Sequence, residues 1–390
     1  MMKDSQNRVV WMDWLRVAAC FMVMVVHSTE PFYLGGDGGL VLTRADAFWV
    51  GLTDSFVRVC VPLFVVASSY LLFPLRYSAG EFVRRRAARL LIPFLIWTVV
   101  YALVWGEPVD NFKGLLLNFN YAAGHLWFVY MLVGLYVLMP LLSPWAEKVG
   151  KKELQAYLGI WLLSTLIPYL RAWFGGELTV ISGPTGIPME AQYPLWGECC
   201  WNSFGAFYYV SGFIGYMLLG LYFRKFLGEL SWGRTLAVAV PAWIVGFAIS
   251  AGGFIRRMIA SADGSFPADV SVAMSVAWET TITYCTLGVV LMTVAWMLVF
   301  RKITCSGGFY RRIVRPLSEA GYGMYLCHML VLSAFASLFR SSLGIGADGA
   351  LGIWTTPVEI LLTAVCSFIC VALAAVIIRR IPKVGKFIMG

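Results

Sequence analysis

The chain has 390 residues, of which 60% are hydrophobic and only 13% are charged. Soluble domains average about 45–50% apolar and about 25% charged residues, so this composition excludes an ordinary soluble protein and indicates several membrane-spanning helices. The formal net charge is +9, but the basic residues cluster between hydrophobic segments, which favours a role in membrane orientation over nucleic-acid binding.

Hydrophobic segments follow one another along the whole chain. A helix that crosses a membrane needs roughly 20 predominantly apolar residues, and the polar stretches between the segments are too short for a soluble domain. The sequence therefore predicts an all-α, polytopic transmembrane helical bundle that forms a single domain over residues 1–390. The ten predicted spans are 11–30, 48–74, 88–106, 123–142, 154–174, 203–223, 235–255, 278–300, 317–339 and 353–378.

The distribution of Lys and Arg sets the predicted orientation. Of the 30 basic residues, 22 fall in the segments on one side of the predicted membrane and 6 on the other, while Arg16 and Arg58 lie inside spans. Because positive residues are retained on the cytoplasmic side of a membrane, we expect both termini to be cytoplasmic.

Polar residues form a stripe in the first predicted span. The eleven positions from Arg16 to His27 turn a helix by about 1,100° and advance it by roughly 16–17 Å, so the two side chains share a face. Asp13 lies one turn before Arg16, where the two charges can compensate each other in a structural or a functional pair. Because charged groups avoid lipid, this face is expected to point into the bundle or into a watery cavity.

Two further groups of charges occur in the next two spans. Asp54 and Arg58 lie four residues apart in the second span and are expected to pair. An arginine cluster opens the third span at its cytoplasmic end, where it suits either topology control and lipid contact or the binding of phosphate. The cluster consists of Arg84, Arg85, Arg86 and Arg89.

All three histidines lie in or at the edge of predicted spans. Histidine has an ordinary pKa of about 6.5, which suits general acid–base catalysis, although a single one can equally be a hydrogen-bonded core residue. His27 is the strongest candidate because it shares a face with Arg16, and His125 and His328 come second. Trp127, next to His125, suits stacking on a sugar ring or a place at the membrane interface.

A belt of hydroxyl groups precedes the last histidine in the ninth predicted span. Ser318, Tyr322 and Tyr325 follow one another at helical spacing and share a face near His328. Such a stripe is compatible with packing or with a role in the site. The nine cysteines include no CxxC pair and no Cys/His cluster at metal-ligand spacing, so no metal site is predicted.

Five motifs spread along nearly the whole chain resemble the integral membrane acyltransferase 3 family, whose best-known members O-acetylate bacterial surface glycans. Ser69 stands where the family's SGYL element has glycine, which leaves the close packing expected at that position open. The motifs are MDWLRVAACFMVMVVH (12–27), FVRVCVPLFVVASSYLL (56–72), RRRAARLLIPFLIW (84–97), HLWFVYMLVGLYVLMPLL (125–142) and SEAGYGMYLCHMLV (318–331).

The resemblance implies transfer of an acyl group, usually acetyl, from cytoplasmic acetyl-CoA to a hydroxyl of a surface or lipid-linked carbohydrate in the bacterial inner membrane. It implies that His27 acts as catalytic base or acyl relay, supported by Arg16, and the polar stripe adds Asp13 as a third catalytic candidate. It also implies that the arginines of an RRxxR motif contact CoA phosphates, without a metal. These are Arg85, Arg86 and Arg89, and the residues expected at the acceptor are His125, Trp127, Tyr325, His328, Arg58, Ser318 and Tyr322.

A different function class is compatible with the same spans. A transporter or flippase for a lipid-linked saccharide could line its pathway with the polar stripe of the first helix. It would move its substrate without consuming acyl-CoA and without strong dependence on the RRxxR arginines. A small-molecule receptor is a third possibility that no feature of the sequence favours.

Overall fold

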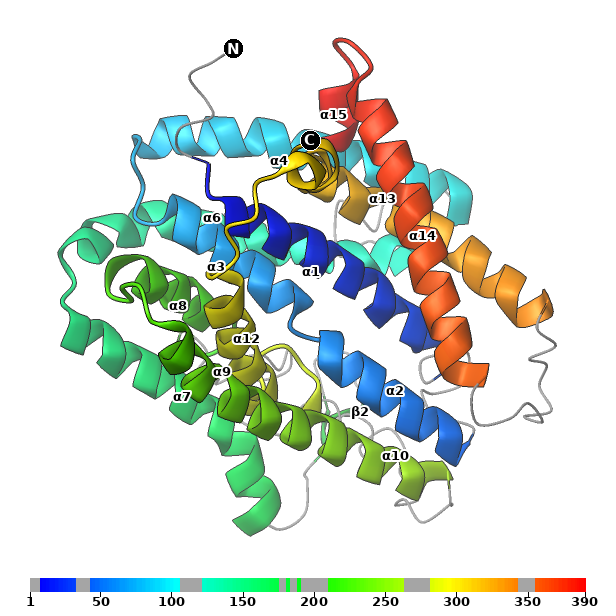
Figure 1. Cartoon of the computed structure of the whole chain (residues 1–390), viewed down its shortest axis with the longest axis horizontal. Coiled ribbons are helices and arrows are strands. Elements are labelled where there is room, and N and C mark those ends of the chain that lie inside the picture. Colours follow the sequence, from blue (N-terminus) through cyan, green and yellow to red (C-terminus); the bar gives the residue numbers. More distant parts are fainter. Residues whose placement is uncertain are drawn as a thin grey trace.

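A computed structural model describes residues 8–32, 43–105, 121–174, 180–182, 188–190, 210–262, 281–342 and 355–390. Helices and their connections make up this part of the chain, apart from one short antiparallel pair of strands, β1 (Val180–Ser182) and β2 (Pro188–Glu190). The predicted all-α fold is therefore confirmed (Figure 1).

Within the described ranges, seven helical segments are long and apolar enough to cross a membrane by length and composition. They overlap seven of the ten predicted spans, while the count of ten and the cytoplasmic location of both termini stay predictions. The seven segments are Val10–Phe32, Arg44–Leu72, Ala79–Trp105, Ala123–Lys148, Trp232–Ala260, Tyr310–Phe339 and Thr356–Arg379.

The other three predicted spans also contain helices. The fifth corresponds to α7 (Lys151–Phe174). The sixth contains α8 (Phe213–Lys225), and its residues before 210 lie outside the described part of the chain. The eighth contains α12 (Leu287–Phe300), whose 14 residues are fewer than the roughly 20 that a full crossing needs.

The second predicted span is divided into two helices. Helix α2 (Arg44–Val57) is followed by its C-cap residue Arg58, and α3 (Cys60–Leu72) begins after Val59. The Arg58 side chain turns back to Asp54, so the predicted pair forms, with 2.9 Å between Nη2 and Oδ2. Because both side chains are almost completely buried, the pair shields its charges from lipid at the point where the helix breaks.

Helix α1 (Val10–Thr29) is the centre of the bundle. It contacts α2, α3, α13 (Arg315–Ser342) and α14 (Thr355–Arg379), and it continues into the short 3-10 helix η1 (Glu30–Phe32) (Figure 1). Neighbours on several sides explain how a membrane helix keeps a polar stripe, because protein rather than lipid covers it.

Helices α3 and α8 pack closely at the position where serine replaces the family's glycine. Ser69 is fully buried and donates a hydrogen bond to the carbonyl of Met217, 2.5 Å away. The glycine at this contact lies on the opposite helix. A Cβ on Gly220 would lie 2.7 Å from the carbonyl oxygen of Val66, so a larger residue would not fit there. The expected close packing is thus present, with the small residue on α8.

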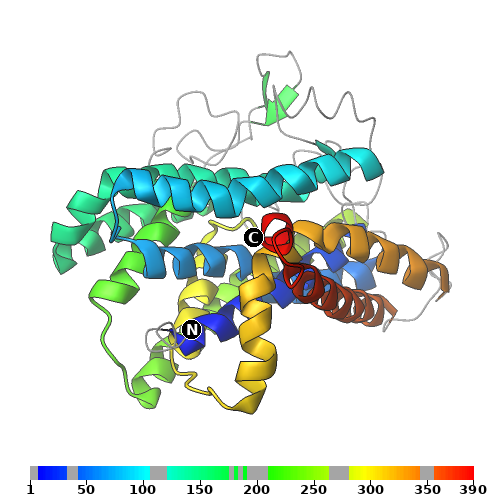
Figure 2. The same ribbon diagram turned by 90° about the horizontal axis from the view of Figure 1, so that it is seen from above.

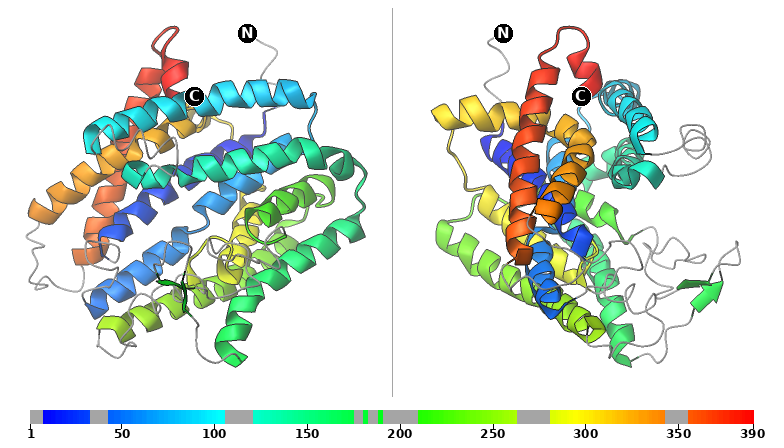
Figure 3. Two further views of the ribbon diagram at one scale, coloured as in Figure 1. Left: turned by 180° about the vertical axis from the view of Figure 1, so that it is seen from behind. Right: turned by 90° about the vertical axis from the view of Figure 1, so that its right-hand side faces the viewer.

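The remaining elements complete the bundle around this centre. Helices α4 (Ala79–Trp105) and α6 (Trp127–Lys148) run side by side across one face, as Figures 2 and 3 show. The others are η2 (Tyr121–Leu126), α9 (Trp232–Phe247), the π-helix η3 (Ala248–Gly252), α10 (Gly253–Ala262), the π-helix η4 (Tyr310–Val314) and α15 (Gly385–Met389).

Candidate active site

A cavity of ≈ 280 Å³ lies along the polar stripe of α1. Because α1 is an unbroken helix, the sequence-based spacing holds, and Arg16 and His27 line two regions of the same cavity. The sequence-predicted residues that line it are Arg16, His27, Arg86, Arg89, His125, Trp127, Ser318, Tyr322 and Tyr325.

One end of the cavity is cationic. The guanidinium groups of Arg16, Arg86, Arg89 and Arg379 line it, and none of them makes a hydrogen bond or ion pair with a residue that the structure describes. The Nε atom of Arg86 is buried without a partner in the same ranges. Unpaired guanidinium groups in a partly enclosed space favour an anionic ligand, and their planar forks fit phosphate oxygens.

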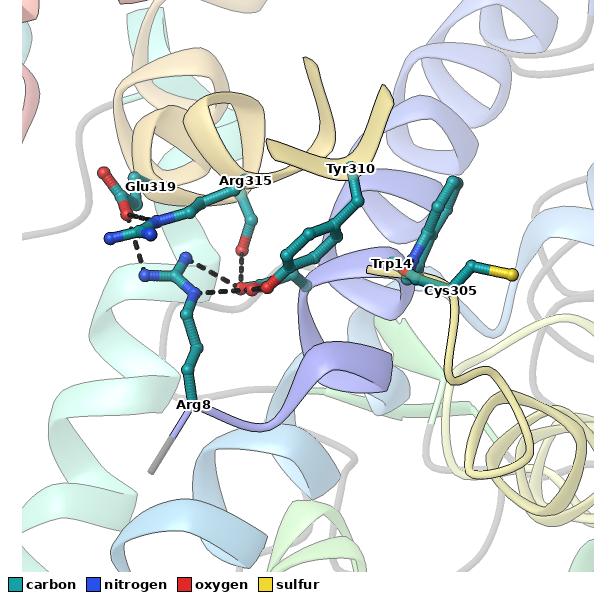
Figure 4. Close-up of polar contacts among 8 residues, drawn as sticks. Arg8, Trp14, Cys305, Tyr310, Arg315 and Glu319 are labelled. Carbon is teal, nitrogen blue, oxygen red and sulfur yellow. Dashed lines mark hydrogen bonds and ion pairs between the residues drawn. The ribbon is translucent and has the colours of Figure 1, made fainter. Parts of the chain in front are cut away.

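Asp13 does not pair with Arg16 as the sequence predicted. Its two carboxylate oxygens accept hydrogen bonds from the Arg8 guanidinium at 2.6 and 3.0 Å, from the Tyr310 hydroxyl at 2.6 Å and from the Ser318 hydroxyl at 2.6 Å (Figure 4). These donors come from before α1 and from η4 and α13, which one-helix spacing cannot reveal. Asp13 therefore connects the start of α1 to the late helices, and among the described residues Arg16 makes no direct ion pair with it.

The acidic side chain that lines the cavity is engaged elsewhere. Glu319 accepts hydrogen bonds from Arg8 at 2.7 Å and from Arg315 at 3.1 Å (Figure 4). Burial disfavours the charge on Arg8, but the hydrogen bonds and negative charge of Asp13 and the charge of Glu319 outweigh it and raise the pKa of the guanidinium. Arg8 thus stays charged and holds Glu319, which limits how far this carboxylate can neutralise the cavity arginines.

His27 makes a hydrogen bond that the sequence analysis missed. Its Nδ1 lies 2.8 Å from the carboxylate of Glu30, which follows α1 in η1. A carboxylate accepts hydrogen bonds only, so in the neutral form of the imidazole Nδ1 carries the hydrogen and Nε2 has the lone pair. The spacing of three residues between His27 and Glu30 was a visible signal for this pair.

The three histidines converge from separate parts of the chain. The ring centroid of His328, on α13, lies 5.0 Å from that of His27 and 5.1 Å from that of His125, which precedes α6. His328 is fully buried beside the cavity, and its Nδ1 donates to the carbonyl of Tyr325 at 2.5 Å. The Nε2 atoms of His125 and His328 are buried without a partner among the described residues, so two further imidazoles with unused nitrogens lie close to His27.

An aromatic surface faces the same end of the cavity. The ring of Trp127 stacks on that of Tyr284, with centroids 5.5 Å apart and planes inclined by 29°. The Tyr284 hydroxyl accepts a hydrogen bond from Arg58 at 3.4 Å, so the Arg58–Asp54 pair supports this surface from behind. Arg58 itself does not line the cavity in the part of the chain that is described.

Comparison with known families decides which class of protein builds this cavity. A family model for an acyltransferase domain, acyltransferase 3, matches residues 9–378. The chain belongs to the acyltransferase 3 family. No curated protein and no solved structure matches it. Together with the seven apolar helices, this membership makes the protein a multi-pass membrane acyltransferase.

In this acyltransferase, the RRxxR arginines divide into two groups. Arg86 and Arg89 line the main cavity, whereas Arg85 pairs with Glu81 at 2.5 Å and lies over the Tyr77 ring, 4.5 Å from its centroid. Arg85 lines a second cavity of ≈ 200 Å³, to which Arg86 and Arg89 also contribute. The two cavities therefore share two arginines and form neighbouring cationic spaces.

The predicted hydroxyl belt of the acyltransferase lines the cavity, and its hydroxyls are bound to protein groups. Ser318 donates to the carboxylate of Asp13, while Tyr322 and Tyr325 donate at 2.7 Å to the main-chain carbonyls of Leu90 and His125. Each hydroxyl thereby ties α13 to another element. Among the described residues, no group of three or more His, Cys, Asp or Glu side chains is arranged to hold a metal ion.

Proposed function

We propose that this acyltransferase moves an acetyl group from cytoplasmic acetyl-CoA to a hydroxyl of a surface or lipid-linked carbohydrate in the bacterial inner membrane. One observation supports the proposal above all others. A single cavity is lined by four guanidinium groups without a hydrogen-bond or ion-pair partner among the described residues and by a histidine whose Nε2 is oriented to act as a base. Those two features match a donor that carries phosphates and an acceptor that must lose a proton.

The donor is proposed to enter at the cationic end. Phosphate groups do not cross lipid, so the phosphates of CoA remain with Arg86 and Arg89, and the thioester extends along α1 towards His27. The helix separates Arg16 from His27 by roughly 16–17 Å, a distance that an extended pantetheine arm can follow. Arg16 belongs to the cationic end, where its guanidinium can hold an oxygen of the donor.

The chemistry follows from the neutral imidazole. In the proposed direct mechanism, Nε2 of His27 takes the proton of the acceptor hydroxyl as its oxygen attacks the thioester carbonyl. A C–O bond forms, the C–S bond breaks, and the departing CoA sulfur receives the proton from His27. Glu30 orients the ring and stabilises the imidazolium while it carries that proton.

A covalent relay uses the same histidine and is separable by experiment. In that version Nε2 attacks the thioester, carries the acetyl group and passes it to the acceptor. Incubation with acetyl-labelled acetyl-CoA in the absence of acceptor distinguishes the two. The direct mechanism predicts no labelled protein, whereas a His27-dependent label establishes the relay.

The acceptor is proposed to bind against the aromatic surface. Trp127 and Tyr284 line the cavity with stacked rings, and the apolar faces of a sugar pack favourably on such surfaces. His125 also lines the cavity and can meet a sugar hydroxyl, whereas His328 is fully buried behind it, with the two ring centroids 5.1 Å apart. Retention of the acceptor KM after Trp127→Leu would assign this tryptophan to packing.

The decisive experiment follows CoA release and acetyl transfer by the purified protein in lipid nanodiscs, with acetyl-labelled acetyl-CoA and crude surface glycans. Release of CoA together with label in the glycan fraction is the expected result. Absence of acetyl-CoA binding and of CoA release, combined with movement of a lipid-linked saccharide across the bilayer, would instead establish a transporter.

The two groups of arginines provide a matched comparison for donor binding. Arg86→Ala and Arg89→Ala are each expected to raise the KM for acetyl-CoA by about 10-fold or more, because each removes a charge-assisted hydrogen bond to phosphate. Arg85→Ala is expected to have a smaller effect, since Arg85 is already paired with Glu81. Equal effects of all three substitutions, or changes in membrane insertion alone, would contradict this division.

The Glu30 carboxylate is expected to support the base rather than to react. Glu30→Gln should lower kcat by about 10- to 100-fold and leave the KM for acetyl-CoA nearly unchanged, because the amide can still accept from Nδ1 but does not stabilise the imidazolium. Steady-state kinetics with Glu81→Gln as control test this, since Glu81 is an exposed partner of Arg85. An unchanged kcat would remove Glu30 from the mechanism.

A further inference from the structure

The short helix α15 is docked on the bundle at defined points. It contacts α4, α13 and α14, and its position near α4 and α13 is visible in Figure 1, where the label C marks that end of the chain. The indole N–H of Trp97, on α4, donates to the carbonyl of Ile388 at 2.9 Å. Met389 is completely buried. A helix of five residues has no stability of its own, so these contacts determine where it lies.

A glycine on α13 makes room for this segment. A Cβ on Gly323 would lie 2.7 Å from the Cβ and Sδ atoms of Met389 and 2.9 Å from its carbonyl oxygen. Such distances are too short for any side chain, and the main-chain oxygen cannot move without moving α15. Gly323 and Trp97 therefore form a receptor for residues 388 and 389, built from two helices that are distant in the sequence.

The docked segment reaches the cationic end of the main cavity. Gly390 lines that cavity together with Arg89 and Tyr322. Gly390 packs closely against both residues. A Cβ on Gly390 would lie 2.6 Å from the Tyr322 ring and 3.3 Å from the carbonyl oxygen of Arg89. Residues 388 to 390 thus run from the Trp97 anchor to the arginines proposed to hold phosphate.

We propose that the segment Gly385–Gly390, held by Trp97 and Gly323, forms one wall of the donor-binding pocket and positions the phosphate-bearing donor against Arg86 and Arg89. This inference rests on the proposed function, because the donor is taken to be acetyl-CoA. Trp97 and Gly323 are positioning residues. Neither lines the cavity among the described residues, and each acts through the segment that does.

The first test removes the anchor and keeps the packing. Trp97→Phe deletes the indole N–H while retaining an aromatic ring on α4, and it is expected to raise the KM for acetyl-CoA by roughly 2- to 12-fold, the value of one ordinary hydrogen bond. The expected kcat and acceptor KM stay close to those of the native protein. Trp145→Phe is the matched control, because its indole N–H donates to Glu153 at 2.8 Å, away from α15.

A second substitution displaces the segment from the other side. Gly323→Ala is expected to raise the KM for acetyl-CoA at least as much as Trp97→Phe, and thermal unfolding in nanodiscs verifies that the bundle remains folded. A donor KM that is unchanged in both folded variants overturns the proposal. A lowered donor KM also overturns it, because the segment would then obstruct the pocket instead of forming its wall.

Direct binding of acetyl-CoA to the native protein separates this inference from the proposed function. If the native protein neither binds acetyl-CoA nor releases CoA from it, the proposed function fails. If the native protein binds acetyl-CoA and both variants bind it equally well, only the role of the segment Gly385–Gly390 fails.

Discussion

His27→Ala is expected to lower the rate of acetyl transfer by about 10²- to 10⁴-fold, the contribution of a positioned general base. The Glu30 carboxylate fixes the hydrogen of His27 on Nδ1, and alanine removes the Nε2 lone pair that this arrangement presents. CoA release from labelled acetyl-CoA in nanodiscs measures the effect. The bundle should remain folded, because the His27 side chain lies at the end of α1 and lines a cavity rather than filling a packed core.

The neighbouring residue offers a matched control for this substitution. The Ser28 hydroxyl donates within α1 to the carbonyl of Met24 at 2.7 Å, and Ser28 does not line the cavity in the described part of the chain. Ser28→Ala should therefore keep most of the native rate. A folded His27→Ala protein that transfers acetyl at the rate of Ser28→Ala would end the catalytic assignment.

Arg16→Met is expected to reduce transfer by about 10- to 150-fold and, at the same time, to raise the temperature of unfolding. The loss of rate corresponds to a charge-assisted hydrogen bond of about 1.5–3 kcal/mol to the donor. The gain in stability arises because a charge without a partner is costly to keep among apolar helices, and methionine replaces it with a side chain of similar shape. When a residue is retained for function at the expense of stability, its replacement lowers the rate of transfer and raises the temperature of unfolding.

A paired arginine supplies the contrast. Arg58→Met leaves the buried carboxylate of Asp54 without its ion pair, so it should lower the temperature of unfolding. Differential scanning calorimetry of both variants in the same nanodiscs shows whether each substitution raises or lowers the temperature of unfolding. If Arg16→Met lowers the temperature of unfolding as Arg58→Met does, then Arg16 is a structural residue and the cationic donor site loses its central member.

Helical periodicity was sufficient to predict contacts and faces that involve residues of a single helix. The predicted common face of Arg16 and His27 and the Asp54–Arg58 pair required only the geometry of an unbroken turn, and the structure confirms both. The division of the second span after Val57 was not predicted, although Pro62 is a signal for it, because proline has no N–H to donate to the carbonyl of Arg58 four residues earlier.

Contacts between distant segments were beyond reach, since periodicity gives the direction of a side chain but not its neighbour. The predicted Asp13–Arg16 pair was wrong for this reason, because Tyr310 follows Asp13 by 297 residues and no local pattern connects them. The sequence analysis counted Arg379 only as one of the cytoplasmic basic residues, whereas in the structure Arg379, at the end of α14, lines the cavity. Glu30, by contrast, was within reach of the spacing rule and was overlooked.

The central position of α1 has a consequence for how the protein is made. At about 5–20 residues per second, the ribosome needs roughly 15–60 s to proceed from Asp13 to Tyr310, which lies 297 residues later. During that interval α13 and α14 do not exist, and the polar stripe of α1 has no late helix to cover it. We therefore expect α1 to remain at the insertion machinery, or beside a membrane chaperone, until the last third of the chain has been synthesised. Crosslinking of stalled nascent chains should show its release only after α13 has emerged.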